Sequence, residues 1–337
     1  SNDLNSGNEN IILLGFLIKG GKLDMLGTNP VSVNQAGTGN ALTVTKYLEL
    51  DGFIDLNGES QLIQTEGSIL AGAGRLDRDQ QGTGSSYNYN YFCSPVSTLG
   101  NSQNSGYSIA DVLRSGTDPA NPSIINFNYQ YHFADGPLAS PLRISTYWLY
   151  KFYGEAGLYN EWHWVGKDGH LDAGEGFTMK GSSGQLGILD LQNYVFKGMP
   201  NNGRVSVTIG ENQNHLVGNP YHSAIDADEF RKDNLEGRRG DNIFNGSLYF
   251  WSHFSGKTHY LQEYVGGYAT YNLAGGVKAV SNDARINATG ETGGMEPKQY
   301  IPPGQAFFMN TVVDNDITNW ASKLPQPVGI VGGEIQF

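Results

Sequence analysis

The chain has 337 residues, including 46 glycines, and only 16% of its residues are charged. Its formal net charge of −12 and the lack of a basic stripe argue against a nucleic-acid-binding protein. No apolar run approaches the about 18 residues of a transmembrane helix, so we expect no membrane span. The single cysteine, Cys93, excludes an internal disulfide. Frequent turn residues and scarce helix-period segments predict an all-β fold of many short strands.

Residues 1–78 carry short apolar pairs at regular intervals. The pairs recur every six to eight residues: Leu48 and Leu50, Ile54 and Leu56, Leu62 and Ile63, Ile69 and Leu70. Asp51-Gly52 and Asn57-Gly58 suit the tight corners between them. This spacing predicts stacked short strands, as in a β-solenoid, where each rung buries its apolar side chains against the next. A run of ordinary hairpins is the alternative.

Residues 79–203 and 204–337 share landmarks in the same order, which predicts an internal duplication. Ser94-Pro95 is followed 125 residues later by Asn219-Pro220. Three further pairs match in texture: SIADVL (108–113) with AIDADEF (224–230), STYWLYKF (145–152) with GSLYFWSHF (246–254), and GEGFTM (174–179) with GQAFFM (304–309). We therefore expect each half to form a β-sandwich unit.

Both units are expected to follow one plan. A strand ends at the proline, which cannot donate to a ladder. A short helix follows, with Asp111, Asp226 or Asp228 near its start, where negative charge suits the helix dipole. An aromatic strand then supplies the core, and its alternate side chains face opposite sides of the sheet. Two separate sandwiches and one larger pseudo-symmetric sandwich both fit this plan.

The stretch HLVGNPYHSAID, residues 215–226, contains the residue types of a Ser-His-Asp triad. Ser223 lacks the G-x-S-x-G elbow of many serine hydrolases, and the matching segment of the first unit has no histidine. The simpler interpretation is structural: Asn219-Pro220 ends a strand, and Ser223 or Asp226 caps the following helix. We therefore expect no catalytic residues here.

Two further constellations are candidate sites. Trp162 and Trp164 place two indoles on one face of a strand, where they either stack on a sugar ring or belong to the core. Asp314 and Asp316 flank an asparagine in a segment with loop character, and carboxylates in loops are common calcium ligands. This segment does not continue into an EF-hand pattern, so solvated carboxylates are the alternative. We expect no other cofactor.

Several of these segments resemble known proteins. LVGNPYHSAIDADEF, NGSLYFW, IPPGQAFF, LDGFIDLNGESQLIQTEGS and YNYNYFCSPVS resemble segments of large secreted surface proteins of Bacteroidota, especially gliding-motility adhesins. The resemblance covers roughly residues 47–309, and in that group such segments stand before the sorting domain of the type IX secretion system. Departures occur at His222, where proline is commoner, at Ala306, where glycine is commoner, and at Cys93, where serine or tryptophan is commoner.

The resemblance implies an extracellular position on the bacterial cell surface and carries no catalytic residues over. The first residues, SNDLNSGNEN, lack the regions of a signal peptide, and we expect the chain to be a segment of a longer protein. The expected function is a non-catalytic structural or adhesive module that supports attachment or gliding. Its partners are cell-surface or secretion-system proteins, or surface glycans. A carbohydrate-binding module within a larger secreted protein is the alternative.

Overall fold

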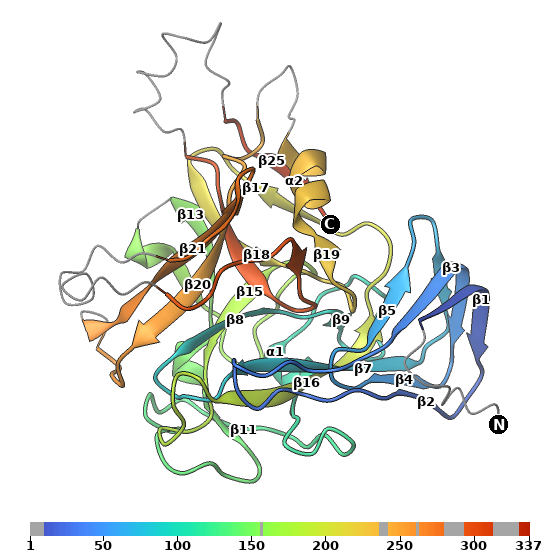
Figure 1. Ribbon diagram of the computed structural model, residues 1–337, viewed down its shortest axis with the longest axis horizontal. Helices are drawn as coiled ribbons and strands as arrows, with labels where there is room; N and C mark the ends of the chain where they lie inside the picture. The colour runs from blue at the N-terminus through green and yellow to red at the C-terminus, as the bar shows by residue number, and fades with distance from the viewer. Residues whose placement is uncertain (1–9, 156–157, 236–241, 261–262, 280–292, 313–329) are drawn as a thin grey trace, which may run out of the picture.

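The computed structural model describes residues 10–155, 158–235, 242–260, 263–279, 293–312 and 330–337. Strands dominate this part of the chain, which confirms the all-β class, and its two α-helices are α1 (Ile109–Val112) and α2 (Ala227–Leu235). No helix among these residues is long and apolar enough to cross a membrane. Figure 1 shows the N-terminal strands at one end of the molecule and the later strands beside and above them.

The N-terminal strands stack in parallel in two sheets. In one sheet, β1 (Ile11–Ile18) pairs with β3 (Ala41–Leu50), and β3 pairs with both β5 (Gln61–Gln64) and β6 (Ile69–Ala71). In the other, β2 (Lys22–Met25) pairs with β4 (Phe53–Leu56), and β4 pairs with β7 (Arg75–Thr83). Hairpins would pair antiparallel, so these strands follow the parallel sense expected of stacked rungs.

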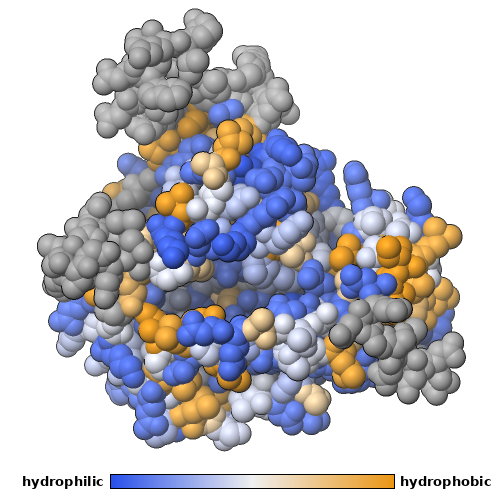
Figure 2. All heavy atoms as spheres, in the orientation of Figure 1, coloured by the Kyte–Doolittle hydropathy of each residue, from blue (hydrophilic) through white to orange (hydrophobic). Residues whose placement is uncertain are grey.

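The apolar pairs of the sequence supply the core between these two sheets. Leu48 and Leu62 from the first sheet and Ile54 and Leu76 from the second are fully buried in one apolar cluster. On the outer side of β1, Ile12, Leu14 and Leu17 are 72%, 73% and 56% exposed. Figure 2 shows apolar surface gathered at this N-terminal end of the molecule.

Strand β7 crosses the boundary that we expected at residue 78. Its other edge pairs antiparallel with β16 (Leu191–Pro200), from Leu76 opposite Gly198 to Thr83 opposite Leu191. The resulting six-stranded sheet also contains β10 (Leu113–Ser115) and β9 (Val96–Ser97), which pair with β16. Strands of the N-terminal part and of the first unit therefore share one sheet.

The two expected sandwich units also share a sheet, with nine strands. The first unit contributes β8 (Tyr89–Cys93), β13 (Tyr150–Glu155), β14 (Trp162–Trp164) and β15 (Gly176–Lys180). The second contributes β18 (Gln213–Gly218), β20 (Leu248–Ser255), β21 (Val265–Asn272), β22 (Gly275–Val277) and β24 (Ala306–Asn310). Because β13 pairs with β18, the sheet is continuous across residues 203 and 204. Strands from both halves of the chain therefore belong to one sheet.

Strand register supports the predicted duplication. In the first unit, Phe177 of β15 lies opposite Phe92 of β8. In the second, Phe307 of β24 lies opposite Val217 of β18. Phe92 and Val217 each stand three residues before the proline that follows their strand, Pro95 or Pro220. The landmarks therefore occupy equivalent positions in two strand pairs.

The two units also exchange equivalent contacts. The amide of Cys93 donates to the carbonyl of Gly304 at 2.8 Å, and the amide of Gly218 donates to the carbonyl of Gly174 at 3.0 Å. Both acceptor glycines have a left-handed backbone, with φ of 69° at Gly304 and 90° at Gly174, which side-chain-bearing residues adopt at a cost. This reciprocal exchange is the pattern of a pseudo-twofold relation between the halves.

Three short pairs complete the described strands: parallel β11 (Asn126–Asn128) with β12 (Arg143–Ser145), antiparallel β17 (Ser206–Ile209) with β25 (Gly333–Gln336), and antiparallel β19 (Ile225–Asp226) with β23 (Tyr300–Ile301). The 3-10 helices are η1 (Thr146–Trp148) and η2 (Tyr159–Glu161). A second apolar cluster, centred on Phe307 and Phe244, lies under α2, β17 and β25.

Helix α2 begins with the side-chain cap that the sequence predicted. Asp226 Oδ1 accepts hydrogen bonds from the amides of Asp228 (2.9 Å) and Glu229 (3.3 Å). Replacing Asp226 with Ala is expected to cost about 1 kcal/mol, because two amides of the first turn lose their acceptor. Thermal unfolding of the two proteins measures this cost. A Ser223→Ala variant is the control, and an equal loss in both variants would contradict the assignment of the cap to Asp226.

Candidate functional site

The stretch from residue 215 to 226 makes structural contacts. Asn219 is fully buried, and its Nδ2 donates to the carbonyls of Ser223 (2.8 Å), Ile301 (3.1 Å) and Pro302 (3.2 Å). Its Oδ1 accepts from the amide of Tyr221 at 2.9 Å. The side chain of Asn219 thus connects the end of β18 to the turn before β24, which is a structural role.

His222 in the same stretch joins the N-terminal strands to the second unit. It is 2% exposed, and its Nδ1 donates to the carbonyl of Leu62 in β5 at 2.6 Å. Burial lowers the pKa of His222 to about 4, so the imidazole is neutral at pH 7. Nearby, the amide of Ala224 donates to Gln61 Oε1 at 2.8 Å. These contacts give His222 a role in packing two parts of the chain together.

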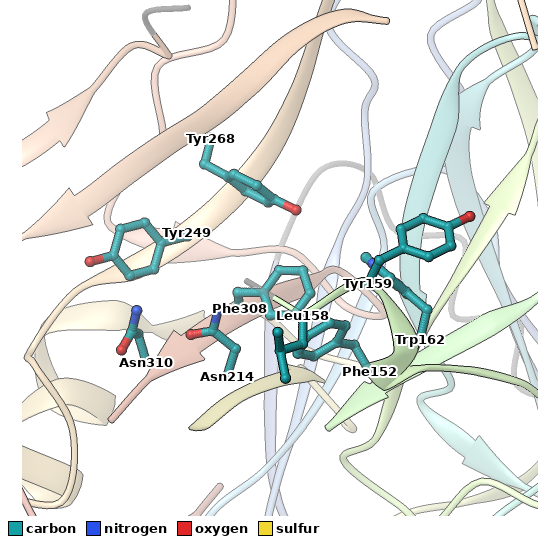
Figure 3. A pocket seen from close by; sticks show the side chains of 9 residues that line it. All are labelled: Phe152, Leu158, Tyr159, Trp162, Asn214, Tyr249, Tyr268, Phe308 and Asn310. Atoms are coloured by element: carbon teal, nitrogen blue, oxygen red, sulfur yellow. The ribbon is translucent and has the colours of Figure 1, made fainter. Parts of the chain in front are cut away.

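A cleft lined by aromatic side chains lies on one face of the nine-stranded sheet. It consists of two cavities of about 300 and 430 Å³, which share Tyr159, Trp162 and Tyr268; we call the two together the aromatic cleft. The smaller cavity is further lined by Tyr89, Tyr91, Tyr147, Trp148, Tyr150, Thr178, Trp251, His259 and Tyr264. The larger one, shown in Figure 3, is further lined by Phe152, Leu158, Asn214, Tyr249, Phe308 and Asn310.

Strand alternation explains why so many rings meet there. Tyr89 and Tyr91, Tyr150 and Phe152, and Tyr249 and Trp251 are pairs two residues apart on β8, β13 and β20. Side chains two residues apart in a strand face the same side of the sheet. The alternating segments YNYNYF and LYFW therefore carried a signal for this face. Their pairing across the two units was not visible in the sequence.

Of the two candidate tryptophans, the structure places one in the cleft. Trp162 lines both cavities and packs edge-on against Phe152, with ring centroids 5.0 Å apart, and against Phe308 at 5.8 Å. Trp164 lines neither cavity; it is 52% exposed and donates from Nε1 to the carbonyl of Thr146 at 2.8 Å. Trp162 is thus part core and part cleft wall, whereas Trp164 lies outside the site.

Two buried polar atoms of cleft-lining residues have no hydrogen-bond partner in the described part of the chain. They are Nε1 of Trp251, whose side chain lines the smaller cavity, and Oδ1 of Asn214, whose side chain lines the larger one. Buried polar atoms in native proteins almost always have partners, from protein, water or ligand. Both atoms have almost no accessible surface, so they lie beneath the surface of the cleft.

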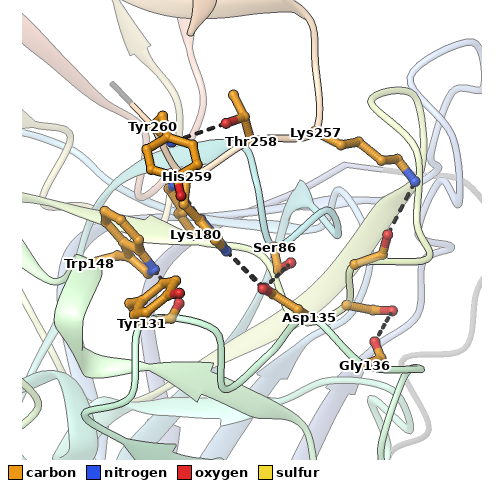
Figure 4. Close-up of polar contacts among 12 residues, drawn as sticks. Ser86, Tyr131, Asp135, Gly136, Trp148, Lys180, Lys257, Thr258, His259 and Tyr260 are labelled. Carbon is orange, nitrogen blue, oxygen red and sulfur yellow. Dashed lines mark hydrogen bonds and ion pairs between the residues drawn. The ribbon is translucent and has the colours of Figure 1, made fainter. Parts of the chain in front are cut away.

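A polar network stands against the wall of the smaller cavity (Figure 4). Lys180 Nζ donates to His259 Nδ1 at 3.0 Å and contacts the hydroxyl of Tyr264. His259 Nε2 lies 3.0 Å from both carboxylate oxygens of Asp135, and Ser86 donates to Asp135 at 2.8 Å. Burial lowers the pKa of Lys180 to about 7 and also lowers that of His259. Sequence reasoning missed this network, because its members are spread over residues 86 to 264.

The structure does not test the candidate calcium site, since Asp314 and Asp316 lie outside the described residues. The sequence has two further Asp-x-Asp pairs, Asp77/Asp79 and Asp226/Asp228, and a carboxylate of each has protein partners. Asp79 accepts from Asn29 at 2.7 Å and from the amide of Gly58 at 2.8 Å, and Asp226 caps α2. Among the described residues, no group of three or more His, Cys, Asp or Glu side chains is arranged to hold a metal ion.

A family model described as a domain of unknown function, DUF8693, matches residues 28–321. The chain belongs to this family. The matched residues include both domain boundaries expected from the sequence, at residues 78 and 203. In the structure, too, a sheet continues across each of these two positions. No curated protein and no solved structure matches the chain.

Proposed function

We propose that this DUF8693 domain is a non-catalytic adhesive module that holds a glycan in its aromatic cleft. The observation that carries this proposal is the cleft itself, whose aromatic rings come from both units. The sequence suggested two functions, an adhesive module and a carbohydrate-binding module, and this proposal combines them. It assigns Trp162 a direct contact with the ligand.

The chemistry of the cleft suits a sugar. The C–H faces of a pyranose ring are apolar and stack on aromatic side chains, while the ring's hydroxyls need hydrogen-bond partners at the edges. Tyr159, Trp162 and Tyr268 offer stacking faces where the two cavities meet, and Asn214 and Asn310 offer amides at one end. Among the described residues, no Asp, Glu, Lys or Arg side chain lines either cavity, so these surroundings favour an uncharged ring over an ionic ligand.

The size of the cleft is also suitable. Small-molecule sites occupy about 300–1,000 Å³, and the two cavities have volumes of about 300 and 430 Å³. Because the cavities share three side chains, a short oligosaccharide would place successive rings in each. Tyr159, which lines both cavities and is 73% exposed, would extend the contact from the cavities to the surface.

The proposed location is the outer surface of a bacterial cell. The resemblance of residues 47–309 to gliding-motility adhesins exported by the type IX secretion system supports it. In that setting, the partners are surface glycans together with neighbouring cell-surface or secretion-system proteins. The module would support attachment of the cell to a glycan-bearing surface.

A structural module without a ligand is the second candidate. The exposed apolar side chains Ile12, Leu14 and Leu17 on the edge strand β1 favour it, because an open apolar edge suits contact with another part of a larger protein. This candidate needs no aromatic cleft. The two functions therefore differ in whether the isolated domain binds a glycan.

The test begins with a glycan microarray, followed by calorimetry on the glycans that bind. Replacing Tyr159 with Ala is expected to weaken binding about two- to tenfold, because a stacked aromatic face contributes about 0.5–1.5 kcal/mol. Tyr159 is 73% exposed, so folding should be unaffected. Tyr300→Ala is the matched control: Tyr300 is 61% exposed and lies outside the cleft. No bound glycan, or equal affinity of the Tyr159 variant, would refute the proposal.

A further inference from the structure

Lys180 is a buried lysine without a carboxylate partner among the described residues. It lies on β15, is 2% exposed, and its Nζ stands 3.8 Å from the ring centroid of Trp148. The rings of Tyr264 and Tyr89 lie 4.6 and 4.9 Å from the same nitrogen. A buried lysine is ordinarily paired with an acid, so this surrounding of aromatic rings calls for an explanation.

The amine contacts a base that is itself held in place. Asp135 accepts from His259 Nε2, so the imidazole carries its proton on Nε2 and presents an unprotonated Nδ1 to Lys180 Nζ at 3.0 Å. Stacking on Trp148, with centroids 5.1 Å apart, fixes the plane of the imidazole. Nucleophile, base and orienting carboxylate in hydrogen-bond contact form the arrangement that activates a side chain for covalent chemistry.

The amine stands directly behind the wall of the aromatic cleft. All four groups that surround Nζ, from Tyr89, Trp148, His259 and Tyr264, line the cavity of about 300 Å³. Burial behind these side chains removes water from the amine, and this desolvation favours the neutral, nucleophilic amine over the ammonium ion. Consistent with this, the pKa of Lys180 is lowered to about 7 by burial.

We propose that Lys180 is a nucleophilic amine that captures aldehyde groups of ligands in the aromatic cleft as imines, with His259 as its base and Asp135 positioning His259. The Nζ lone pair forms a C–N bond with the carbonyl carbon, and His259 Nδ1 takes a proton from the nitrogen. His259 passes this proton, and then the second proton of the nitrogen, to the carbonyl oxygen, which leaves as water while C=N forms. The sum is amine plus aldehyde giving imine plus water, with no change of oxidation state.

This inference extends the proposed function but stands on its own observation. A reducing sugar offers an aldehyde in its open-chain form, so a glycan end bound in the cleft would be a ligand of the right class. The capture of a small aldehyde does not depend on glycan binding. Retained glycan binding without capture would refute this inference alone, and capture without glycan binding would refute only the proposed function.

The experiment uses 4-hydroxybenzaldehyde, a small aromatic aldehyde that matches the cleft, with cyanoborohydride to reduce any imine to a stable amine. Peptide mass spectrometry then gives the rate of modification at each lysine at pH 7. Lys180 is expected to react at least about tenfold faster than Lys232, whose side chain is 67% exposed and whose pKa is raised by its hydrogen bond with Glu229. The rate at Lys180 should rise with pH around 7 and then level off.

Three variants separate this chemistry from a structural role. His259→Phe keeps an aromatic ring on Trp148 but removes the base, and should slow capture at Lys180 at least about tenfold. Asp135→Asn should move the pH dependence of capture, and Lys232→Arg should leave it unchanged. Circular dichroism checks that each variant is folded. Capture at Lys180 no faster than at Lys232 in the unaltered protein would overturn the proposal, as would an unchanged rate in folded His259→Phe.

Discussion

Lowering the pH from 7 to 4 is expected to remove about 3 kcal/mol of stability through His222 alone. The folded-state pKa of His222 is lowered by burial to about 4, against 6.5 for the free side chain. The unfolded chain therefore takes up a proton below pH 6.5 that the folded chain does not, and stability falls from pH 6.5 down to about 4. Denaturant unfolding across this pH range measures the loss.

A His222→Asn variant isolates this contribution. The asparagine amide replaces the Nδ1 donor to the carbonyl of Leu62 but does not titrate. The variant should lose about 3 kcal/mol less between pH 7 and pH 4 than the unaltered protein. His170→Asn is the control, because the side chain of His170 is 64% exposed. His215 keeps part of the acid sensitivity, since burial lowers its pKa too. Equal pH dependence in the His222 variant would contradict the buried, neutral state of His222.

Replacing either Phe177 or Phe307 with Ala is expected to destabilise the protein by about 3–5 kcal/mol. Both rings are fully buried at equivalent positions of the two units. Phe177 packs against Phe92, with centroids 6.2 Å apart, and Phe307 packs against Phe250 at 5.5 Å. Each deletion leaves a cavity in one of the two larger apolar clusters, and the midpoint of denaturant unfolding reports its cost.

The comparison between the two variants tests the duplication itself. Equivalent positions in equivalent strand pairs should give similar losses, and Leu substitutions at both positions should give smaller ones, because less volume is removed. Leu273→Ala serves as a surface control, since Leu273 is 90% exposed. A large loss at one position with almost none at the other would show that the two units do not use the landmark in the same way.

The stacked strands illustrate how far local patterns reach. Apolar pairs at short intervals, such as Ile54 and Leu56, predicted buried faces, and those side chains are buried. The pattern alone left hairpins open, because period-2 alternation is the same in parallel and antiparallel strands. The partner of β4 is decided by contacts with β2 and β7, which lie about 20 to 30 residues away in the chain.

Domain boundaries were the least predictable part. A change in sequence texture near residue 78 suggested the end of a unit, but the nine residues of β7 run through it. Local composition reflects which residues form turns and strands, whereas a strand can join a sheet wherever another strand has an unpaired edge. Strand β7 pairs with β4 on one side and β16 on the other, and only the second pairing joins the N-terminal strands to the first unit.

By itself, the sequence determined the all-β class, the strand ends before Pro95 and Pro220, and a cap for α2 from either Ser223 or Asp226. Each depends on spacing within a few residues. Tertiary structure alone decided that the units share one sheet, that Trp162 and not Trp164 meets the cleft, and that Asp135, His259 and Lys180 touch. His259 lies 79 positions from Lys180 and 124 from Asp135, and no local preference specifies such contacts: they arise where strands pair and bury their faces together.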